Sequence, residues 1–437
     1  MSAEMPREAK VSGSPQVASP ALSFAPRVES ATRSARRRVA RFAGRAATLL
    51  SRAVRLGEGS VVGGALARRI APHIAGELAE SMRVVVVSGT NGKTTTTRLI
   101  ADAMPEGPPA TNRTGANLVN GVVGALIGRP DARTAVLEVD EAIVRWALET
   151  LGPDVLVLLN LSRDQLDRMH EVSALAEGWR TAITRNPPRV VVANADDPLI
   201  VYAVGETNVS WVAAGLLWTT DAATCLWCGG VIEFAATGWQ CRRCDHRRPP
   251  CAMTLDGDTV QTATWHQDLS LALPGRSVRA NAVMALAAIE QLGLPLTGAI
   301  ECWRGIRSIQ GRYEVSNYYG TDMRLHLAKN PAGWRDTLDV IGADALPVVL
   351  VLNARAEDGR DPSWIWDVPF DQLCDRTVVC LGERSSDLAV RLAYADIDAR
   401  EATSLRNAAE IVGPGPVHLV ANYSAFQQSR ATLAHRR

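Results

Sequence analysis

Short apolar runs alternate with amphipathic stretches over most of the chain after residue 81. Between residues 82 and about 303, these apolar runs cover 83–88, 134–139, 154–160 and 189–194. Alternation of strand-length and helix-length segments is typical of a mostly parallel sheet with helices on both faces. From residue 311 the alternation resumes, with candidate strands at 323–328, 347–353, 376–381 and 417–421. The pattern therefore predicts an α/β fold with two α/β regions in succession.

The region before residue 82 has a different pattern. Residues 1–35 contain few aromatic residues, many small ones and no apolar period, so we expect a disordered tail. From 36 to 81, arginines alternate with alanine, valine and leucine at roughly helical spacing, which predicts a basic helical segment. Such a helix most often packs on its own domain. Attraction to anionic lipid headgroups is the alternative.

The length and charge of the chain limit what it can be. The 437 residues allow two or three domains, and we place a central domain at 82–310 and a C-terminal domain at 311–437. The formal net charge of +1 gives no support to a general role in binding nucleic acid. No apolar run is long enough to cross a bilayer, and no secretory signal is visible. We expect a cytoplasmic protein, with the inner face of the cell membrane as an open alternative.

The candidate strand at 83–88 leads directly into the segment Gly89-Thr90-Asn91-Gly92-Lys93-Thr94-Thr95. A strand, a tight glycine turn and a helix start place backbone N–H groups and the positive end of a helix dipole around a phosphate. In such a loop, Lys93 reaches the terminal phosphates and the hydroxyl of Thr94 holds Mg²⁺. The spacing departs from the usual P-loop, because Val87 stands where the first glycine is expected. The segment nevertheless predicts a site for a nucleoside triphosphate.

Lysine is rare in this chain. The three lysines are Lys10, Lys93 and Lys329, against a large surplus of arginine. Arginine cannot replace lysine where a compact ammonium must fit a tight phosphate pocket. We therefore single out Lys329, beside Lys93, as a candidate for a specific role.

Acidic and polar side chains follow two further strand candidates. The run that ends with Glu138, Asp140 and Glu141 lies at the carboxyl end of a predicted core strand, where sheet enzymes bind ligands. Glu138 is our first choice to complete the magnesium shell begun by Thr94. An acidic helix N-terminus fits Asp140 and Glu141 better. The polar cluster at 160–170 could line the same site or cap a helix.

Four of the eight cysteines form two CxxC pairs joined by a short segment that contains glycine: Cys225, Cys228, Cys241 and Cys244. Four thiolates at this spacing predict a structural Zn²⁺ site in a ribbon at about 224–247, inserted into the central domain. Arginines around the ribbon could contact nucleic acid, but more often such residues form a solvated face. We expect the other four cysteines, Cys251, Cys302, Cys374 and Cys380, to be small buried apolar residues.

Two further positions are candidates for contacts with a bound nucleotide. Asn281 lies in the first turns of a predicted helix that follows Gly275. Arg312 lies at the junction of the two α/β regions, where its side chain could reach a bound phosphate from the second domain.

Taken together, these residues resemble the Mur ligase superfamily, whose members activate a carboxylate with ATP and couple it to an amine. The segment GTNGKTT at 89–95 is similar to that family's own P-loop, which accounts for the unusual spacing. The resemblance implies a magnesium carboxylate at Glu138, an adenine-side asparagine at Asn281 and an interdomain arginine at Arg312. It also implies a P-loop central domain with the four-cysteine zinc ribbon inserted, followed by a smaller Rossmann-like α/β C-terminal domain.

Within the superfamily, the chain resembles the MurT family of lipid II isoglutaminyl synthase subunits. Little ordered chain precedes Gly89, and no lysine lies between Lys93 and Lys329 to match the carbamylated lysine of the UDP-MurNAc peptide ligases. The four-cysteine ribbon, a KNPxG element at 329–333 and a DGxDxSWxWD signature at 358–367 agree with the MurT pattern. The similarity spans about Arg41 to Arg430.

That resemblance implies ATP-dependent amidation of D-glutamate in the lipid II stem peptide to D-isoglutamine, through an acyl phosphate. It also implies a heterodimer with a GatD-like glutamine amidotransferase subunit, which supplies ammonia and uses an aspartate of this chain. That aspartate is Asp358 or Asp361, and the sequence does not rank them. Without the resemblance, a turn followed by a helix N-cap would explain both residues.

Other functions fit part of the pattern. A stand-alone Mur-like ligase that adds an amino acid would lack the expected carbamylated lysine. A zinc-ribbon ATPase that binds nucleic acid would need a basic face, which the net charge does not support. A non-catalytic scaffold that holds nucleotide as a structural ligand is a further alternative.

Overall fold

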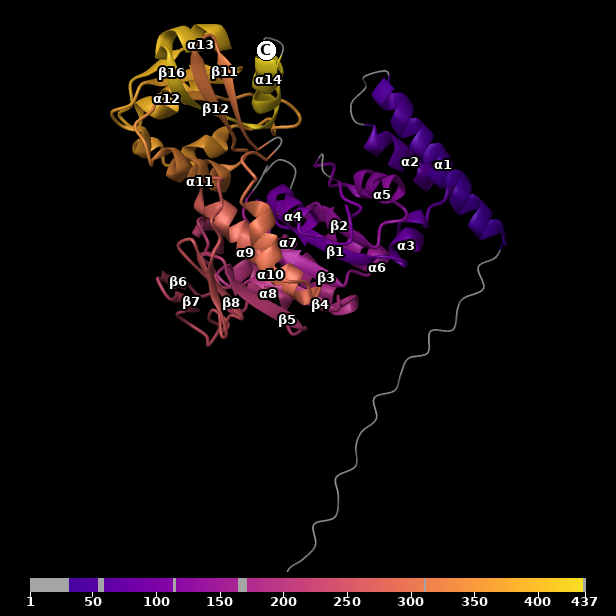
Figure 1. The fold of residues 1–437 in the computed structure, drawn as a ribbon. Helices are drawn as coiled ribbons and strands as arrows, with labels where there is room; N and C mark the ends of the chain where they lie inside the picture. The colour runs from indigo at the N-terminus through magenta and orange to yellow at the C-terminus, as the bar shows by residue number, and fades with distance from the viewer. Residues whose placement is uncertain (1–30, 54–58, 113–114, 164–170, 310–311, 435–437) are drawn as a thin grey trace, which may run out of the picture.

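The computed structural model describes residues 31–53, 59–112, 115–163, 171–309 and 312–434. The strands of these residues form an eight-stranded sheet, a six-stranded sheet and a two-stranded ribbon. Figure 1 shows the two sheets in two separate parts of the molecule, each flanked by helices. The strands of the first sheet run from indigo to rose, and those of the second are orange and yellow. The prediction of an α/β fold with two sheets and a small cysteine-containing insertion is confirmed.

The first sheet has the order β10-β9-β8-β5-β4-β3-β1-β2. Its strands from β2 to β8 are parallel, and β9 and β10 continue the sheet antiparallel. The register pairs Val87 with Glu138 and with Val157, so the ends of β1, β2 and β3 meet at one edge. The strands are β1 (Arg83–Ser88), β2 (Thr134–Glu138), β3 (Val155–Leu158), β4 (Val190–Asn194), β5 (Val209–Ala213), β8 (Met253–Asp256), β9 (Thr259–Thr262) and β10 (His266–Asp268).

Both faces of this sheet are covered, and its central strands are accordingly apolar over most of their length. Val84 and Val86 of β1 point into one core and Val85 and Val87 into the other, as the period of two in a strand requires. The first core packs under α3 (Ile74–Ala79), α5 (Val119–Gly128), α6 (Val144–Leu151), α7 (Val172–Arg185) and α8 (Pro198–Val204). The second packs under α4 (Lys93–Asp102), α9 (Arg276–Gln291) and α10 (Leu296–Trp303).

The second sheet has the order β11-β12-β16-β13-β14-β15. It is parallel except for the edge hairpin of β11 and β12. Its strands are β11 (Tyr313–Tyr318), β12 (Thr321–Leu327), β13 (Val348–Val351), β14 (Val378–Leu381), β15 (Ala399–Glu401) and β16 (Gly415–Ala421). One face packs on α11 (Pro331–Ile341), η3 (Ser363–Asp367), η4 (Phe370–Leu373) and α12 (Ser385–Ala393), and the other on α13 (Leu405–Val412) and α14 (Tyr423–Ala434).

Two N-terminal helices, α1 (Ala31–Ala53) and α2 (Ser60–Ile70), lie beside α5 at one end of the first sheet (Figure 1). They approach closely through glycines. A Cβ atom added to Gly63 would lie 2.4 Å from the carbonyl oxygen of Gly44, and one added to Gly64 would lie 1.9 Å from that of Asn120. Among the described residues, no helix is both long and apolar enough to traverse a bilayer.

Several features differ from the sequence-based expectations. α1 begins at Ala31, within the segment expected to be disordered, because the alanine and arginine of 31–38 continue the same helix. β5, β8, β9, β10, β11 and β15 were not predicted. β10, β11 and β15 lie at sheet edges, and all six strands carry polar residues, so they lack the continuous apolar run that marks a central strand.

The close packing of α2 on α5 gives a test of this arrangement. We expect Gly64→Ala to lower the free energy of unfolding by about 2 kcal/mol, because the new methyl group meets a backbone carbonyl that cannot move alone. The control is Gly178→Ala in α7, where a Cβ atom meets nothing within 4 Å. There the gain in helix propensity should stabilise the protein by about 0.5–1 kcal/mol. Equal effects of the two changes in chemical denaturation would contradict this packing.

Candidate functional site

The segment 89–95, which the sequence predicts to bind phosphate, connects β1 to α4 as expected. Gly89 and Gly92 adopt φ angles of 141° and 90°, which favour glycine. The backbone N–H of Thr90 donates to the carbonyl of Asn160 at 2.9 Å, which ties the turn to the end of β3. A Cβ atom at Gly92 would lie 2.1 Å from Oδ1 of Asn281, so Asn281 of α9 contacts the loop itself. The turn is therefore shaped by two neighbouring elements as well as by its glycines.

Lys93 is buried at the start of α4. Its Nζ donates to the carbonyl of Gly89 at 2.6 Å and forms an ion pair with Oε2 of Glu141 at 2.9 Å. Both side chains are about nineteen-twentieths buried, with exposed fractions of 5% and 3%. The main chain of Glu141 is fixed in turn, because its carbonyl accepts from Nε1 of Trp179 at 3.0 Å. The ammonium is thus held beside the glycine turn by a buried carboxylate.

A chain of hydrogen bonds links the loop to both sheets. The hydroxyl of Thr94 donates to Oε2 of Glu138 at 2.8 Å and accepts from Nη2 of Arg312 at 3.0 Å. Asn117 donates to the other carboxylate oxygen of Glu138 at 3.3 Å. The side chain of Asn112 accepts from the backbone N–H of Glu138 and donates to its backbone carbonyl. The structure therefore brings Thr94, Glu138 and Arg312 together, as the sequence predicts. A threonine hydroxyl and a carboxylate are the donor types that Mg²⁺ accepts.

A second contact between the two parts of the chain lies at the tip of the loop. Nδ2 of Asn91 lies 3.3 Å from Oδ1 of Asn330. Asn330 also caps α11, because its Oδ1 accepts from the backbone N–H of Gly333 at 2.9 Å. The first helix of the second sheet is therefore anchored on the phosphate-binding loop.

Between these elements lies a cavity of about 220 Å³. The loop forms one side, α9 a second and α11 a third, and Arg312 and His326 are among the further residues that line it. Lys93 and Lys329 are the two lysines of the described residues, and both line this cavity. The position of Lys329 beside Lys93 in one cavity agrees with the interpretation that Lys329 has a specific role.

Sequence reasoning did not identify Asp336, which is one of the residues that line this cavity. Ser277 of α9 donates to its Oδ2, while Oδ1 is buried with no hydrogen-bond partner among the described residues. Burial raises the pKa of Asp336 to about 6. A buried carboxylate oxygen without a partner is costly.

A chain of two histidines and an aspartate leads from the cavity into the second sheet. Nε2 of His326 lies 3.0 Å from Nδ1 of His418, whose Nε2 lies 3.1 Å from Oδ1 of Asp344. An ionised carboxylate only accepts, so each Nε2 in the chain donates and Nδ1 of His326 is left as an acceptor. Burial lowers the pKa of His326 to about 3, so that the ring is neutral near pH 7.

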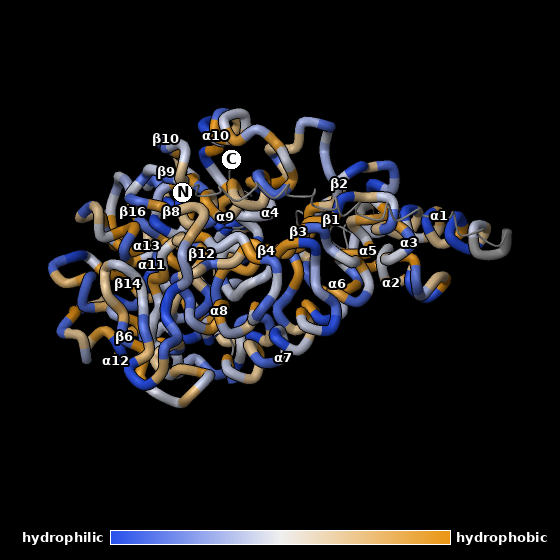
Figure 2. The backbone as a smooth tube through the Cα atoms, turned by 90° about the horizontal axis from the view of Figure 1, so that it is seen from below, coloured by the Kyte–Doolittle hydropathy of each residue, from blue (hydrophilic) through white to orange (hydrophobic). Residues whose placement is uncertain are grey.

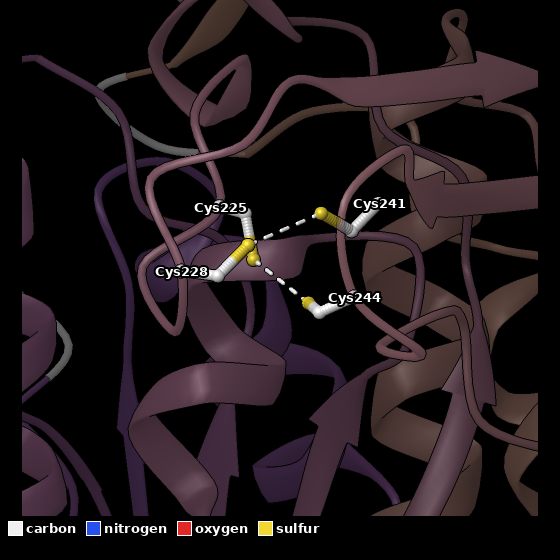
Figure 3. Close-up of side chains that lie close together, drawn as sticks. All are labelled: Cys225, Cys228, Cys241 and Cys244. Atoms are coloured by element: carbon white, nitrogen blue, oxygen red, sulfur yellow. Dashed lines mark hydrogen bonds between the residues drawn. The ribbon is translucent and has the colours of Figure 1, made fainter.

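The four cysteines of the two CxxC pairs meet in one cluster. Figure 3 shows Cys225 and Cys228 facing Cys241 and Cys244, with the sulfur atoms toward one another. All four Sγ atoms lie within 4.8 Å of each other, and the two closest contacts are 3.5 and 3.7 Å. A tetrahedral Zn²⁺ with Zn–S bonds of about 2.3 Å requires sulfur atoms about 3.8 Å apart. The cluster therefore fits a metal ion with four thiolate ligands.

The ribbon that carries the cluster donates backbone N–H groups to two of the four sulfur atoms. β6 (Ile232–Ala235) and β7 (Gly238–Cys241) form its hairpin, and it follows η2 (Thr220–Ala222). The backbone N–H groups of Gly230 and Arg243 donate to the sulfurs of Cys228 and Cys241 at 3.4 and 3.3 Å. The N–H of Arg243 is the main reason that the pKa of Cys241 is lowered to about 6.

Comparison with known proteins identifies the family. Residues 87–289 match the Mur ligase middle domain, and residues 327–426 match the MurT ligase C-terminal domain. The chain belongs to the MurT branch of the Mur ligase superfamily. It is accordingly a ligase, and the GTNGKTT segment lies within the residues that match the Mur ligase middle domain.

Curated relatives and solved structures agree with this assignment. The chain is 28% identical to the lipid II isoglutaminyl synthase (glutamine-hydrolyzing) subunit MurT of Streptococcus pneumoniae, over 87% of this chain and 94% of that protein. It is 27% identical to the MurT subunit of Staphylococcus aureus, over 78% and 84% of the two chains. A pseudomurein peptide ligase type C from Methanothermus fervidus has the same fold, with a TM-score of 0.65, 17% identity, and 82% and 79% of the chains covered.

The two aspartates of the MurT signature lie in different environments. Asp358 is buried, and its carboxylate accepts from the backbone N–H of Ser424 at 2.7 Å, from the hydroxyl of Ser424 and from the N–H of Arg355 at 3.3 Å. Asp361 is exposed, and its carboxylate accepts from the N–H and the hydroxyl of Ser363, the first residue of η3, at 2.9 and 3.0 Å. The geometry separates two residues that the sequence could not rank.

Other expectations fare differently. Cys380 is buried as expected, but Cys302 and Cys374 are exposed and Cys251 is half-buried, so the prediction for these three was wrong. An isolated cysteine carries no periodic signal from which burial could be judged. Asp140 caps η1 (Glu141–Ile143) as anticipated, but Glu141 pairs with Lys93 instead of serving the helix start. Residues 164–170 of the polar cluster lie outside the described residues.

Metal analysis tests the cysteine cluster. We expect the purified chain to carry one thiolate-bound metal ion, measured by elemental mass spectrometry. Cys241→Ser should release it and lower the melting temperature by roughly 5 °C, because metal binding contributes directly to folding. Cys302→Ser, at an exposed cysteine outside the cluster, is the control and should change neither quantity. Metal content that is unaffected by Cys241→Ser would disprove the site.

Proposed function

We propose that this chain is the ligase subunit of a lipid II isoglutaminyl synthase. It would use ATP to convert the α-carboxylate of D-glutamate in the lipid II stem peptide to the amide of D-isoglutamine. The proposal is supported by the similarity to the Streptococcus pneumoniae MurT subunit over nearly the full length of both chains. The observation that carries it is the P-loop whose Thr94 is bonded to Glu138 of one sheet and to Arg312 of the other part of the chain.

The chemistry explains why such a site is needed. A carboxylate is a poor electrophile until one of its oxygens becomes a leaving group. Transfer of the γ-phosphoryl group from ATP forms a carboxyl O–P bond and releases ADP. The nitrogen of ammonia then forms the C–N bond, and phosphate leaves. Lys93 and Arg312 are positioned to offset the negative charge on the transferred group.

We assign the nucleotide contacts to the residues around the cavity. The amides of Gly89 to Thr95 would surround the phosphates, and Asn281 and Arg312 would contact the nucleotide from α9 and the second domain. Thr94 and Glu138 would hold Mg²⁺, and a bound magnesium ion neutralises phosphate charge.

We assign the cysteine cluster to Zn²⁺ in a structural role. All four ligands come from the chain, so no coordination position is left for substrate or water. The ribbon packs on the first sheet's domain, where Trp239 donates to the carbonyl of Ala195 at 2.9 Å. Its function would be to stabilise the inserted ribbon.

The ammonia must come from elsewhere. Ammonium is mostly protonated near neutral pH and is then not a nucleophile. We therefore propose a heterodimer with a GatD-like glutamine amidotransferase subunit, in line with the word subunit in the names of the MurT relatives. Asp361 is the better candidate for the aspartate given to the partner's catalytic group, because it is exposed while Asp358 is buried with its oxygens bonded within the chain.

The first test is reconstitution with ATP, lipid II, glutamine and a GatD-like subunit, read by mass spectrometry of the stem peptide. We expect amidated product with the natural chain and a loss of at least about 10³ in kcat/KM for Lys93→Arg, because the larger guanidinium cannot occupy the buried ammonium site. Arg145→Lys on the surface of α6 is the control. Addition of a whole amino acid would favour the stand-alone ligase, and ATP turnover driven by oligonucleotides would favour the nucleic-acid ATPase.

The second test separates the two aspartates. Asp361→Asn should lose amidation driven by glutamine by about 10²-fold or more, while amidation from added ammonium salts at high pH and ATP binding stay intact. Asp358→Asn should instead lower the melting temperature, because a buried carboxylate loses its charge-assisted hydrogen bonds. If Asp358→Asn folds normally and alone loses the glutamine-driven reaction, our assignment is wrong.

A further inference from the structure

The solvent-facing side of α1 is apolar. Phe42 is 78% exposed, Leu49 and Leu50 are each 66% exposed, and Val39 is 58% exposed. Ala46 and Ala53 are exposed as well. The spacing of these six residues is that of one helix face, which we call the outer stripe.

The opposite face of α1 carries small residues. Ala40, Gly44 and Ser51 are buried against α2 and α5. The usual surface helix places its large apolar side chains inward and its polar ones outward. In α1 the large side chains point to solvent, so the packing of the domain gives no reason for them.

Arginines border the outer stripe. The helix contains seven arginines and no acidic residue. Arg38 and Arg45 lie one turn before Phe42 and Leu49 and are themselves exposed, while Nε of Arg45 donates to the carbonyl of Ile127 at 2.9 Å. Arg41 approaches the exposed Asp131 at 3.7 Å. The border of the stripe therefore has a strong positive charge.

We propose that α1 binds the surface of an anionic bilayer, with the outer stripe in the interfacial region and the arginines at the headgroups. A large apolar face bordered by arginines is the pattern of a helix that lies in the plane of a membrane. The adjacent α2 adds Val61, Val62 and Leu66, which are 47%, 52% and 37% exposed. The membrane, rather than a protein, is the occupant that matches both apolar exposure and uniformly positive charge.

The position of α1 agrees with this surface. In both Figure 1 and Figure 2, α1 lies at one end of the molecule, and the second sheet lies toward the other end. A bilayer can therefore contact α1 without covering the cysteine ribbon or the signature at 358–367. The role of this contact rests on the proposed function, because a lipid-linked substrate is presented at a membrane surface.

Vesicle flotation of the full chain tests the inference. We expect binding to phosphatidylcholine vesicles that contain about 30% phosphatidylglycerol, weakening with salt, and far less binding to pure phosphatidylcholine. The double variant Phe42→Glu and Leu49→Glu should lose at least about tenfold in bound fraction. The control is the double variant Val315→Glu and Val390→Glu, which adds the same charge at residues 52% and 53% exposed outside α1.

The outcomes separate this inference from the proposed function. A soluble, short-chain lipid II analogue should be amidated equally by the natural chain and by the α1 variant in the presence of the glutaminase subunit. Equal flotation of the variant and the natural chain, or no flotation of either, would overturn membrane binding. Membrane binding would also be overturned if the α1 substitutions, and not the control substitutions, disrupted a dimer of the chain or its association with the glutaminase subunit. Failure to amidate the analogue with flotation intact would count against the proposed function only.

Discussion

The hydrogen bond from Arg312 to Thr94 is the contact on which the rest of the site depends. Thr94 belongs to the first turn of the helix that follows the phosphate-binding loop, and Arg312 directly precedes the second sheet. The bond therefore joins the two halves of the chain at the point where a terminal phosphate would lie. The Asn91–Asn330 contact repeats this connection at the tip of the loop. Without such contacts the cavity would lose one of its walls.

The buried pair of Lys93 and Glu141 gives the loop its electrostatic character. Removing both charges from water has a large solvation cost, and their contact at 2.9 Å offsets it only while both are present. The pair holds the ammonium at the glycine turn before any ligand arrives. A triphosphate would then meet a cation whose position is already fixed, so less side-chain entropy is lost on binding.

Much of the fold and of the loop could be predicted from the sequence, because both depend on local pattern. The central strands are continuous apolar runs, and the glycines and Lys93 of the loop lie next to one another in the chain. The cysteine pairs likewise carry their spacing with them. The partners of Lys93 and Asp336 could not be predicted in this way, since Glu141 and Ser277 are 48 and 59 residues away from them. Only the folded arrangement of α4, η1, α9 and α11 brings those side chains together.

The scarcity of lysine has a practical consequence. Outside the N-terminal tail, every primary amine on a side chain belongs to Lys93 or Lys329, and both line the same cavity. Amine-selective acylation of this protein would therefore act as a footprint of one site. Protection or exposure of two peptides in a digest would report how fully the cavity is filled, without an engineered reporter.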